Sequence, residues 1–235
     1  MRAVVTGGVK GLGRAFTLEL LNRGYEVIAT YLTSEKEAKE LESKYENLKC
    51  FKCDVTNQVE VSKFFWEMDD LDLLINNAAI AKDENWLFKS LDNFMEVVKV
   101  NLGGVFIVSR YAVTRMMGGT IINISSNNTL GYHNPISMDY DASKAGVNML
   151  TKDFADALKE LEIKVVAIAP GWIDTEAIKE ADPKYIEAEL ARGDQSELID
   201  PNLLAKKILD DMPNYKSGDI IEIKEVEHER HKKIN

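Results

Sequence analysis

The sequence predicts an α/β protein built on a doubly wound parallel sheet of about seven strands, with helices on both faces. Two observations carry this prediction: short apolar runs alternate with helical patterns throughout the chain, and a glycine-rich turn joins the first strand to the first helix. The 235 residues, 45% of them hydrophobic, suffice for one sizeable core, and no linker or repeat divides them. We therefore expect residues 1–235 to form a single domain.

Strands are predicted where a short apolar run is bounded by glycine, asparagine or charged residues. These runs cover residues 2–6, 27–31, 48–53, 71–75, 120–124, 164–169 and 219–223.

Helices are predicted between the strands from helical spacing and from residues that start or stop helices. The expected features are a glycine C-cap at Gly24, a capping box of Ser34 and Glu37 opening a helix to about residue 45, an N-cap at Thr56 for a helix to about residue 68, a start at Ser90, an interruption at Asn101 before a helix to about residue 117, and helices over residues 139–161 and 202–211.

A glycine-rich turn follows the first strand. Residues 6–13 read TGGVKGLG, so the glycines are spaced G-x-x-x-G-x-G rather than in the dinucleotide fingerprint G-x-G-x-x-G. Small residues at such places let the backbone approach a pyrophosphate at the start of a helix. This pattern favours nucleotide binding over an ordinary tight turn.

The end of the second strand bears on the choice between NAD and NADP. An enzyme that uses NAD usually places a carboxylate there for the ribose 2′-hydroxyl. Here the strand ends at Tyr31, and no carboxylate occurs before Glu35, whereas Lys10 in the glycine turn is a cation that could meet a 2′-phosphate. The sequence favours NADP over NAD; the alternative is that Lys10 is an ordinary exposed lysine.

The candidate functional residues all follow strands. Since ligands of open parallel sheets bind at the carboxyl ends of the strands, we expect these residues to lie along one edge. Residues 173–200, a long, polar and partly helical segment, are the best candidate for a substrate lid. The strand ends concerned are those at Gly7, Asp54, Asn77, Ser126 and Pro170.

Tyr140 and Lys144 are four residues apart, a spacing that places both on one face of a helix. A nearby ammonium favours the phenolate and brings the tyrosine pKa toward the range useful for acid–base catalysis. Tyr45 and Lys49 share this spacing, but they lie where a charged helix is expected to end.

Composition restricts the class of partner and the compartment. A net charge of −10 argues against nucleic acid or an anionic membrane. No uninterrupted apolar run reaches the roughly 18 residues of a membrane span, and no signal peptide precedes the first strand, so we expect a cytoplasmic protein. Cys50 and Cys53 lie in a predicted strand without further ligands nearby, so no metal site is expected.

Several short motifs together resemble the short-chain dehydrogenase/reductase family, in its compact single-domain form. They follow the family's order from residue 6 to about residue 175. This resemblance implies a Rossmann-like fold, a nicotinamide cofactor, and hydride transfer between a carbonyl and an alcohol. The motifs are Thr6-Gly7 with Gly11 and Gly13, Asp54-Val55, Asn76-Asn77-Ala78-Ala79, Val100-Asn101, Ile124-Ser125-Ser126, Tyr140 with Lys144, and Pro170-Gly171 with Thr175.

The resemblance also implies residue roles. Tyr140 would be the general acid, Lys144 would lower the tyrosine pKa and hold the nicotinamide ribose, Ser126 would bind the carbonyl oxygen, and Asn101 would anchor a water in a proton relay. The implied cofactor contacts are Gly7, Lys10, Gly11, Leu12, Gly13, Tyr31, Asp54, Val55, Asn77, Ala78, Tyr140, Lys144, Pro170, Gly171, Ile173 and Thr175.

Three departures from the family pattern stand out. The interval from Ser126 to Tyr140 is 14 residues, one more than usual, and Asn127 occupies the usual spacing. The Asn-Asn-Ala motif continues with Ala79 rather than glycine. The last strand is followed by a charged tail over residues 224–233 instead of Gly-Gly.

Among relatives, the chain looks closest to 3-oxoacyl-carrier-protein reductases, so an NADP(H)-dependent carbonyl reductase acting on a small-molecule substrate is the leading hypothesis. An NAD-dependent alcohol, sugar or steroid dehydrogenase is an alternative. A cofactor-binding regulatory protein without catalysis is another, but it would be free to lose the four residues of the active site. Family analogy also implies a homodimer or homotetramer.

Overall fold

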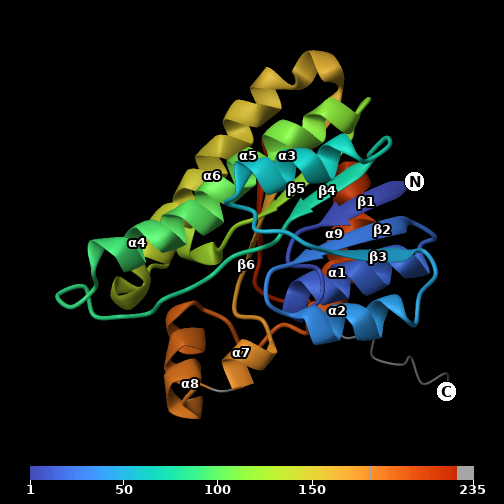
Figure 1. Cartoon of the computed structure of the whole chain (residues 1–235). Helices are drawn as coiled ribbons and strands as arrows, with labels where there is room; N and C mark the ends of the chain where they lie inside the picture. The colour runs from blue at the N-terminus through green and yellow to red at the C-terminus, as the bar shows by residue number, and fades with distance from the viewer. Residues whose placement is uncertain (180, 227–235) are drawn as a thin grey trace, which may run out of the picture.

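A computed structural model gives the structure of residues 1–179 and 181–226, with the side chain of residue 177 left undescribed. Seven parallel strands form one sheet in the order β3-β2-β1-β4-β5-β6-β7, which confirms the predicted fold class (Figure 1). The strands are β1 (Arg2–Val5), β2 (Glu26–Tyr31), β3 (Leu48–Lys52), β4 (Leu73–Asn76), β5 (Gly119–Ile124), β6 (Ile163–Pro170) and β7 (Ile220–Ile223).

The strand order reverses between β1 and β4. From β1 the chain builds the sheet outward through β2 and β3, then returns to place β4 on the other side of β1. Val5 is level with Ala29 of β2 and Ile75 of β4, so the carboxyl ends of the central strands lie together. Loops leaving this switch point diverge, and the crevice between them is where such sheets bind ligands.

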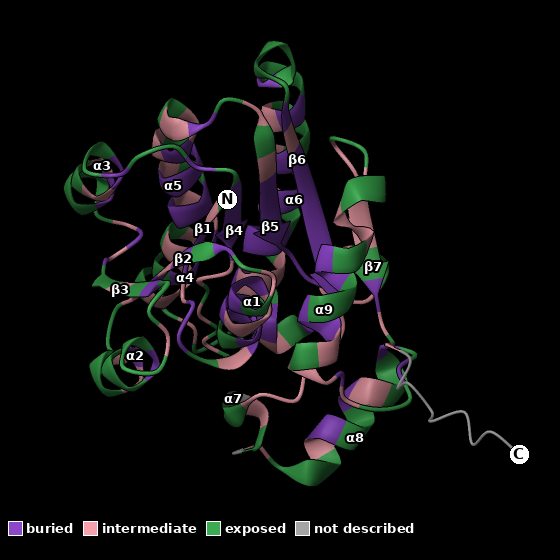
Figure 2. Ribbon diagram, turned by 90° about the vertical axis from the view of Figure 1, so that its right-hand side faces the viewer, coloured by how far each residue is buried: buried purple, intermediate pink, exposed green. Residues whose placement is uncertain are grey.

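Helices cover both faces of the sheet, and alternate strand residues serve each face. Val5 belongs to the core beneath α1, α2 and α9, whereas its neighbour Val4 belongs to the core beneath α3, α5 and α6 (Figures 1 and 2). The helices are α1 (Gly11–Asn22), α2 (Glu35–Glu42), α3 (Gln58–Trp66), α4 (Leu91–Val98), α5 (Gly104–Ala112), α6 (Met138–Ala157), α7 (Glu176–Lys179), α8 (Pro183–Arg192) and α9 (Pro201–Asp211).

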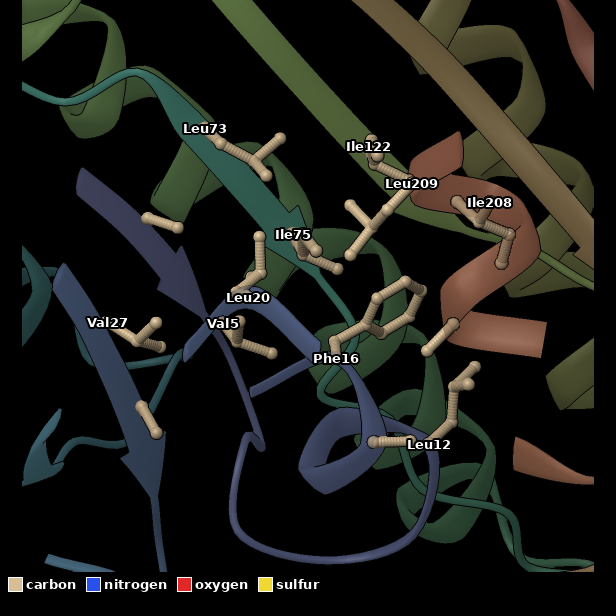
Figure 3. Close-up of a cluster of buried hydrophobic side chains, with 14 of the residues drawn as sticks. Val5, Leu12, Phe16, Leu20, Val27, Leu73, Ile75, Ile122, Ile208 and Leu209 are labelled. Atoms are coloured by element: carbon tan, nitrogen blue, oxygen red, sulfur yellow. The ribbon is translucent and has the colours of Figure 1, made fainter. Parts of the chain in front are cut away.

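The core beneath α1 fixes the glycine turn against the sheet. Phe16 and Leu20, one helical turn apart, are fully buried beside Val5 and Ile75 (Figure 3). Leu12 extends the same stripe toward the start of the helix and is also buried. Burying an aliphatic or aromatic side chain of this size contributes about 1.5–3 kcal/mol. The stripe therefore holds the first turn of α1 at the carboxyl end of β1.

Two predicted N-cap positions are confirmed, and one is wrong. Ser34 is the N-cap residue of α2, but the expected capping box does not form: the Ser34 side chain makes no capping hydrogen bond among the described residues, and Glu37 pairs with Lys10. Asn57 rather than Thr56 caps α3, since Thr56 donates to Asp54 in a local turn. The Ser90 oxygen does accept from the backbone N–H of Asn93 at 3.1 Å, as expected of an N-cap.

The helical stretch Leu91–Arg115 contains α4, a π-helical turn (Lys99–Gly103) and α5. By length and composition it could cross a membrane, which the absence of long apolar runs did not lead us to expect. However, it packs on α3, α6 and β4 within the fold, and the core helix of a soluble protein passes the same test. Asn101 lies inside the π-helical turn, so the predicted interruption is a change of helix type.

The chain after β7 reaches Val226, which packs against the α1 side of the core. The charged tail predicted from the sequence lies mostly beyond it: residues 227–233, with both of the tail histidines, lie outside the described residues.

Candidate active site

The glycine turn has the shape of a phosphate cradle. Gly7 and Gly11 adopt φ values of +62° and +50°, which side-chain-bearing residues rarely adopt. A Cβ on Gly13 would lie 2.1 Å from the Gly7 carbonyl oxygen, so the helix starts in close contact with the turn. The side chain of Leu12 is buried, which leaves its backbone N–H, in the first turn of α1, as the group able to meet a phosphate. The turn fits a dinucleotide pyrophosphate.

Thr6, which was not among the predicted site residues, organises the turn. Its hydroxyl oxygen accepts the backbone N–H groups of Asn77 and Ala78 at 2.9 and 3.0 Å. The Asn77 amide in turn donates to the carbonyl oxygens of Thr6 and Gly7 at 3.0 and 3.3 Å. Asn77 thus binds the strand ends of β1 and β4 together, and this structural role holds whatever it contacts in a cofactor.

Lys10 projects from the turn toward α2. Its ammonium lies 2.9 Å from the Glu37 carboxylate, which raises the pKa of Lys10 through a hydrogen bond. The sequence did not place this carboxylate near the turn. Tyr31, the last residue of β2, is half-buried against the core. The adenosine side of the cradle therefore presents both a cation and a carboxylate.

Asp54 and Val55 follow β3 at the same edge. The Asp54 carboxylate accepts the backbone N–H and the hydroxyl of Thr56, both at 2.8 Å. Val55 is buried, and a Cβ on Gly104 would lie 2.8 Å from its side chain. Ala78 packs against this same core. Ala78 also lies beside Gly7, where a Cβ would be 3.2 Å from the Ala78 Cα, so these residues adjoin the glycine turn.

Tyr140, Ser126 and Lys144 meet at the carboxyl end of β5. The Ser126 hydroxyl hydrogen-bonds the Tyr140 phenol, and this bond acts to lower the tyrosine pKa. The Lys144 ammonium lies 5.5 Å from the centre of the Tyr140 ring and donates to the Ile124 carbonyl at 2.7 Å. Asn127, at the usual serine spacing, has a buried amide nitrogen with no hydrogen-bond partner among the described residues. The structure thus brings Ser126 to the tyrosine despite the longer loop.

Burial dominates the pKa values of this cluster. It raises the pKa of Tyr140 to about 12, although the Ser126 hydrogen bond opposes the shift. It also lowers the pKa of Lys144 to about 8, because a buried ammonium loses its hydration. The expectation that Lys144 would bring the tyrosine pKa down toward neutrality is therefore wrong for the isolated chain. The result is a phenol that keeps its proton at neutral pH.

Asn101 is fully buried beneath this cluster. Its carbonyl oxygen accepts the backbone N–H of Ile80 at 2.8 Å, and its amide donates to the Ile80 carbonyl and to the Ser143 hydroxyl at 2.9 and 3.1 Å. Ser143 donates in turn to the Tyr140 carbonyl at 2.7 Å. Asn101 therefore joins the loop after β4 to the helix that carries Tyr140.

The two ends of the segment between β6 and α9 contact each other. Ile173 pairs with Ile199 as an isolated bridge, and Gln195 bonds the backbone N–H and carbonyl of Trp172, both at 2.8 Å. A Cβ on Gly171 would lie 2.2 Å from the Gln195 side-chain oxygen, so any larger residue at position 171 would displace the Gln195 side chain. Sequence analysis missed Gln195, since nothing in its neighbourhood marks a contact that the folded loop creates.

Within this segment, α7 and α8 lie below the sheet in the view of Figure 1. The methyl carbon of Thr175 would lie 3.4 Å from a Cβ on Gly11, so the predicted cofactor contact at Thr175 reaches the cradle. Pro170, the last residue of β6, is buried at the edge of the sheet. Among the described residues there is no group of three or more acidic, histidine or cysteine side chains able to hold a metal ion.

Comparison with known proteins agrees with this geometry. The family model described as short chain dehydrogenase matches residues 1–186. The 3-oxoacyl-[acyl-carrier-protein] reductase of Thermotoga maritima is 33% identical over 237 aligned positions, with 94% of each chain covered. The 3beta-hydroxysteroid dehydrogenase 1 of Eggerthella lenta is 37% identical over 195 positions, covering 77% of this chain and 74% of the relative. A solved dehydrogenase/reductase from Sinorhizobium meliloti superposes with a TM-score of 0.87 at 27% identity, covering 94% of this chain and 92% of that one.

A doubly wound sheet, a phosphate cradle and a buried tyrosine–lysine pair define a dinucleotide-dependent oxidoreductase. This chain belongs to the short-chain dehydrogenase family. The predicted family resemblance is confirmed, and so is the prediction that the protein is an enzyme. Its cofactor is a nicotinamide dinucleotide, as is general for that family.

Proposed function

We propose that this enzyme reduces a carbonyl group to an alcohol with NADPH, and that Tyr140 protonates the carbonyl oxygen. The observation that carries the proposal is the contact of Tyr140 with Ser126 and Lys144 at the carboxyl end of β5, on the same edge of the sheet as the phosphate cradle after β1. The bound nicotinamide would supply the hydride. Ser126 would bind the carbonyl oxygen, and Lys144 would hold the nicotinamide ribose. Asn101 would anchor a water that restores the proton to Tyr140.

The protonation state of Tyr140 is the one that a general acid needs for carbonyl reduction. Its pKa of about 12 keeps the phenol protonated at neutral pH, so the proton to be donated is in place before the reaction. The reverse reaction needs the phenolate, which burial disfavours. A complete set of Asn101, Ser126, Tyr140 and Lys144 also favours an enzyme over a cofactor-binding regulatory protein.

NADP is the cofactor we propose, with Lys10 meeting the 2′-phosphate. The support is the absence of a carboxylate between Tyr31 and Glu35, together with a lysine inside the cradle. A second candidate is NAD dependence, which one specific observation favours. Glu37 lies 2.9 Å from Lys10, so a carboxylate stands close to where a ribose 2′-hydroxyl would bind. The same two side chains, Lys10 and Glu37, would thus determine the preference for NADP or NAD.

For the substrate we propose a 3-oxoacyl thioester, because the Thermotoga maritima relative is a 3-oxoacyl-[acyl-carrier-protein] reductase that matches nearly the whole chain. The Eggerthella lenta relative keeps a steroid or another small ketone as the alternative. We propose that residues 173–200 act as the lid over this site within a single domain. We also propose a cytoplasmic homodimer or homotetramer that has neither nucleic acid nor a membrane as partner.

The test is a panel of carbonyl substrates assayed with NADPH and with NADH by nicotinamide absorbance. Acetoacetyl-coenzyme A stands for 3-oxoacyl thioesters, a 3-oxosteroid for steroids, and a simple ketose for sugars. We expect reduction of the thioester with NADPH, and a loss of the preference for NADPH in Lys10→Ala. A clear preference for NADH in the unaltered enzyme would contradict the role given to Lys10 and would favour the role of Glu37.

A further inference from the structure

The loop between Ser126 and Tyr140, one residue longer than usual, is fastened to α8 through a buried carboxylate. Glu189 of α8 is only 2% exposed. Its carboxylate accepts the Tyr132 hydroxyl and, at 3.0 Å, the Asn134 side-chain amide. On its other oxygen, Arg192 forms an ion pair at 2.9 Å. A buried carboxylate is costly unless it is paired and hydrogen-bonded, so these three donors offset the cost of burying Glu189 and hold its side chain in place.

The loop side of this contact continues to the catalytic helix. The backbone N–H of Asn134 donates to the Asp141 carboxylate at 2.9 Å, and Asn128 donates to the other oxygen of Asp141 at 2.6 Å. Asp141 is the residue directly after Tyr140. A chain of hydrogen bonds therefore runs from α8 through Asn134 to the start of α6, where the proposed proton donor lies.

A cleft of about 610 Å³ lies between the loop and α8, and Glu189 forms part of its wall. Tyr185 of α8 lines the same cleft and bonds Asn134 at 3.1 Å, while its ring meets the Trp172 ring edge-on at 6.2 Å between centroids. Trp172 lies at the base of the segment, so its surroundings depend on where α8 rests.

We propose that Glu189 is a positioning residue that clasps α8 to the loop over residues 127–137 and so orders the wall of the substrate pocket before substrate binds. This inference rests on the proposed carbonyl reduction and on residues 173–200 being the lid. It also proposes a role for the extra residue of the loop, because the longer loop places both Tyr132 and Asn134 in contact with Glu189. Burial and the Glu189 carboxylate both raise the pKa of Tyr132, which suits a phenol that only donates.

The consequence is a lid that is closed by polar contacts rather than by substrate alone. Without the clasp, substrate would have to order the wall as it binds, so affinity falls while the chemistry at Tyr140 is preserved. A hydrogen bond to a charged group is strong enough for its loss to shift an equilibrium roughly tenfold.

The test uses Glu189→Gln, which keeps the shape but loses the charge, with Glu187→Gln on the same helix as the matched control, since Glu187 is exposed. Both are made in a Trp66→Phe, Trp86→Phe background that leaves Trp172 as the single tryptophan of the three. Acrylamide quenching of Trp172 fluorescence, measured without cofactor or substrate, is expected to increase for Glu189→Gln and to stay unchanged for Glu187→Gln. Tyr132→Phe, which removes one donor, should shift in the same direction if Glu189→Gln does not fold.

The kinetic arm uses acetoacetyl-coenzyme A and NADPH. We expect Glu189→Gln to raise KM for the thioester roughly tenfold while kcat stays within about threefold and the Kd for NADPH is unchanged. Quenching equal to that of the control would overturn the clasp. Increased quenching with an unchanged KM would overturn its role in the pocket. An enzyme inactive on every substrate would refute the proposed function, but the quenching arm would still decide whether the clasp exists.

Discussion

Lys144 is the residue where function and stability oppose each other most directly. Its side chain is 2% exposed, and the Ile124 carbonyl is the one hydrogen-bond acceptor of its ammonium among the described residues. The pKa of about 8 lies below its ordinary value of 10.5 because burial disfavours the charged form. A folded state that carries this ammonium is therefore less stable than one with an apolar side chain of the same length.

We predict that Lys144→Met is more stable than the unaltered enzyme at pH 7, by about 1–3 kcal/mol, and catalytically inactive. Between pH 8 and 10.5 the unfolded chain binds the lysine proton while the folded protein releases it, so the stability of the unaltered enzyme rises across this window. The difference between the two proteins should therefore shrink as the pH rises. Urea unfolding at pH 7 and pH 10 measures it; an unaltered enzyme more stable than the variant at pH 7 would refute the argument.

The sequence predicts that Tyr140 and Lys144 lie close together, but it does not predict which interaction dominates their pKa values. The spacing of Tyr140 and Lys144 placed both on α6, as expected, whereas Tyr45 lies beyond α2 and Lys49 lies in β3. The direction of the Tyr140 pKa shift could not be predicted, since it depends on burial by elements far apart in the chain. The ion pair of Lys10 with Glu37 escaped prediction for the same reason.

Among the elements, the turn between β1 and α1 leaves little room for additional side-chain atoms. Gly13 sits in the first turn of α1, where a side chain would collide with the Gly7 carbonyl and, at 2.5 Å, with the Asn77 amide. Gly103, in the π-helical turn, has nothing within 4 Å of the corresponding position. Gly13 and Gly103 can therefore be compared directly: close contacts exclude a side chain at position 13, whereas position 103 has room for one.

We predict that Gly13→Ala destabilises the protein by about 1–3 kcal/mol or more and weakens NADPH binding, because the turn must open to admit the methyl group. Gly103→Ala should be neutral or stabilise by up to about 1 kcal/mol, since alanine restricts the unfolded chain and favours helix. Denaturant unfolding and NADPH titration of both variants provide the measurement. Equal effects of the two changes would show that close packing at the turn is not what requires glycine.

Element boundaries followed from local patterns more reliably than contacts between elements did. Each predicted strand is present to within two residues, because the runs are apolar and end in turn-forming residues. The capping box of α2 did not form and the N-cap of α3 is Asn57 rather than Thr56, since Glu37 and Thr56 each pair outside the capping pattern. Gln195 and Glu189 could not be found from sequence, since both act across the closed loop between β6 and α9.

The outer surface of α4, α5 and α6 carries exposed apolar side chains. Large apolar side chains are exposed on it, including Met95 at 50%, Phe106 at 44% and Met149 at 58%. Phe106 stacks on Phe154, with ring centres 6.2 Å apart, so the apolar surface of α5 continues onto α6. A surface of this kind supports the proposed homo-oligomer, since self-association would remove it from water.

We predict that Phe106→Glu shifts the protein toward monomers, because a charge at this position must be buried when two copies meet. Trp66→Glu on α3 is the control, since Trp66 is 81% exposed and belongs to α3 rather than to α4, α5 or α6. Sedimentation velocity at equal concentrations distinguishes the two. A Phe106→Glu protein with the mass of the unaltered enzyme would place any interface elsewhere.

The central claim for the whole molecule is that it reduces carbonyls by proton donation from Tyr140. The most direct test compares the unaltered enzyme with Tyr140→Phe, which removes only the hydroxyl, using NADPH and acetoacetyl-coenzyme A. We expect a loss of about 10²–10⁴-fold or more in kcat, with the Kd for NADPH unchanged. Turnover equal to that of the unaltered enzyme would show that Tyr140 is not the proton donor.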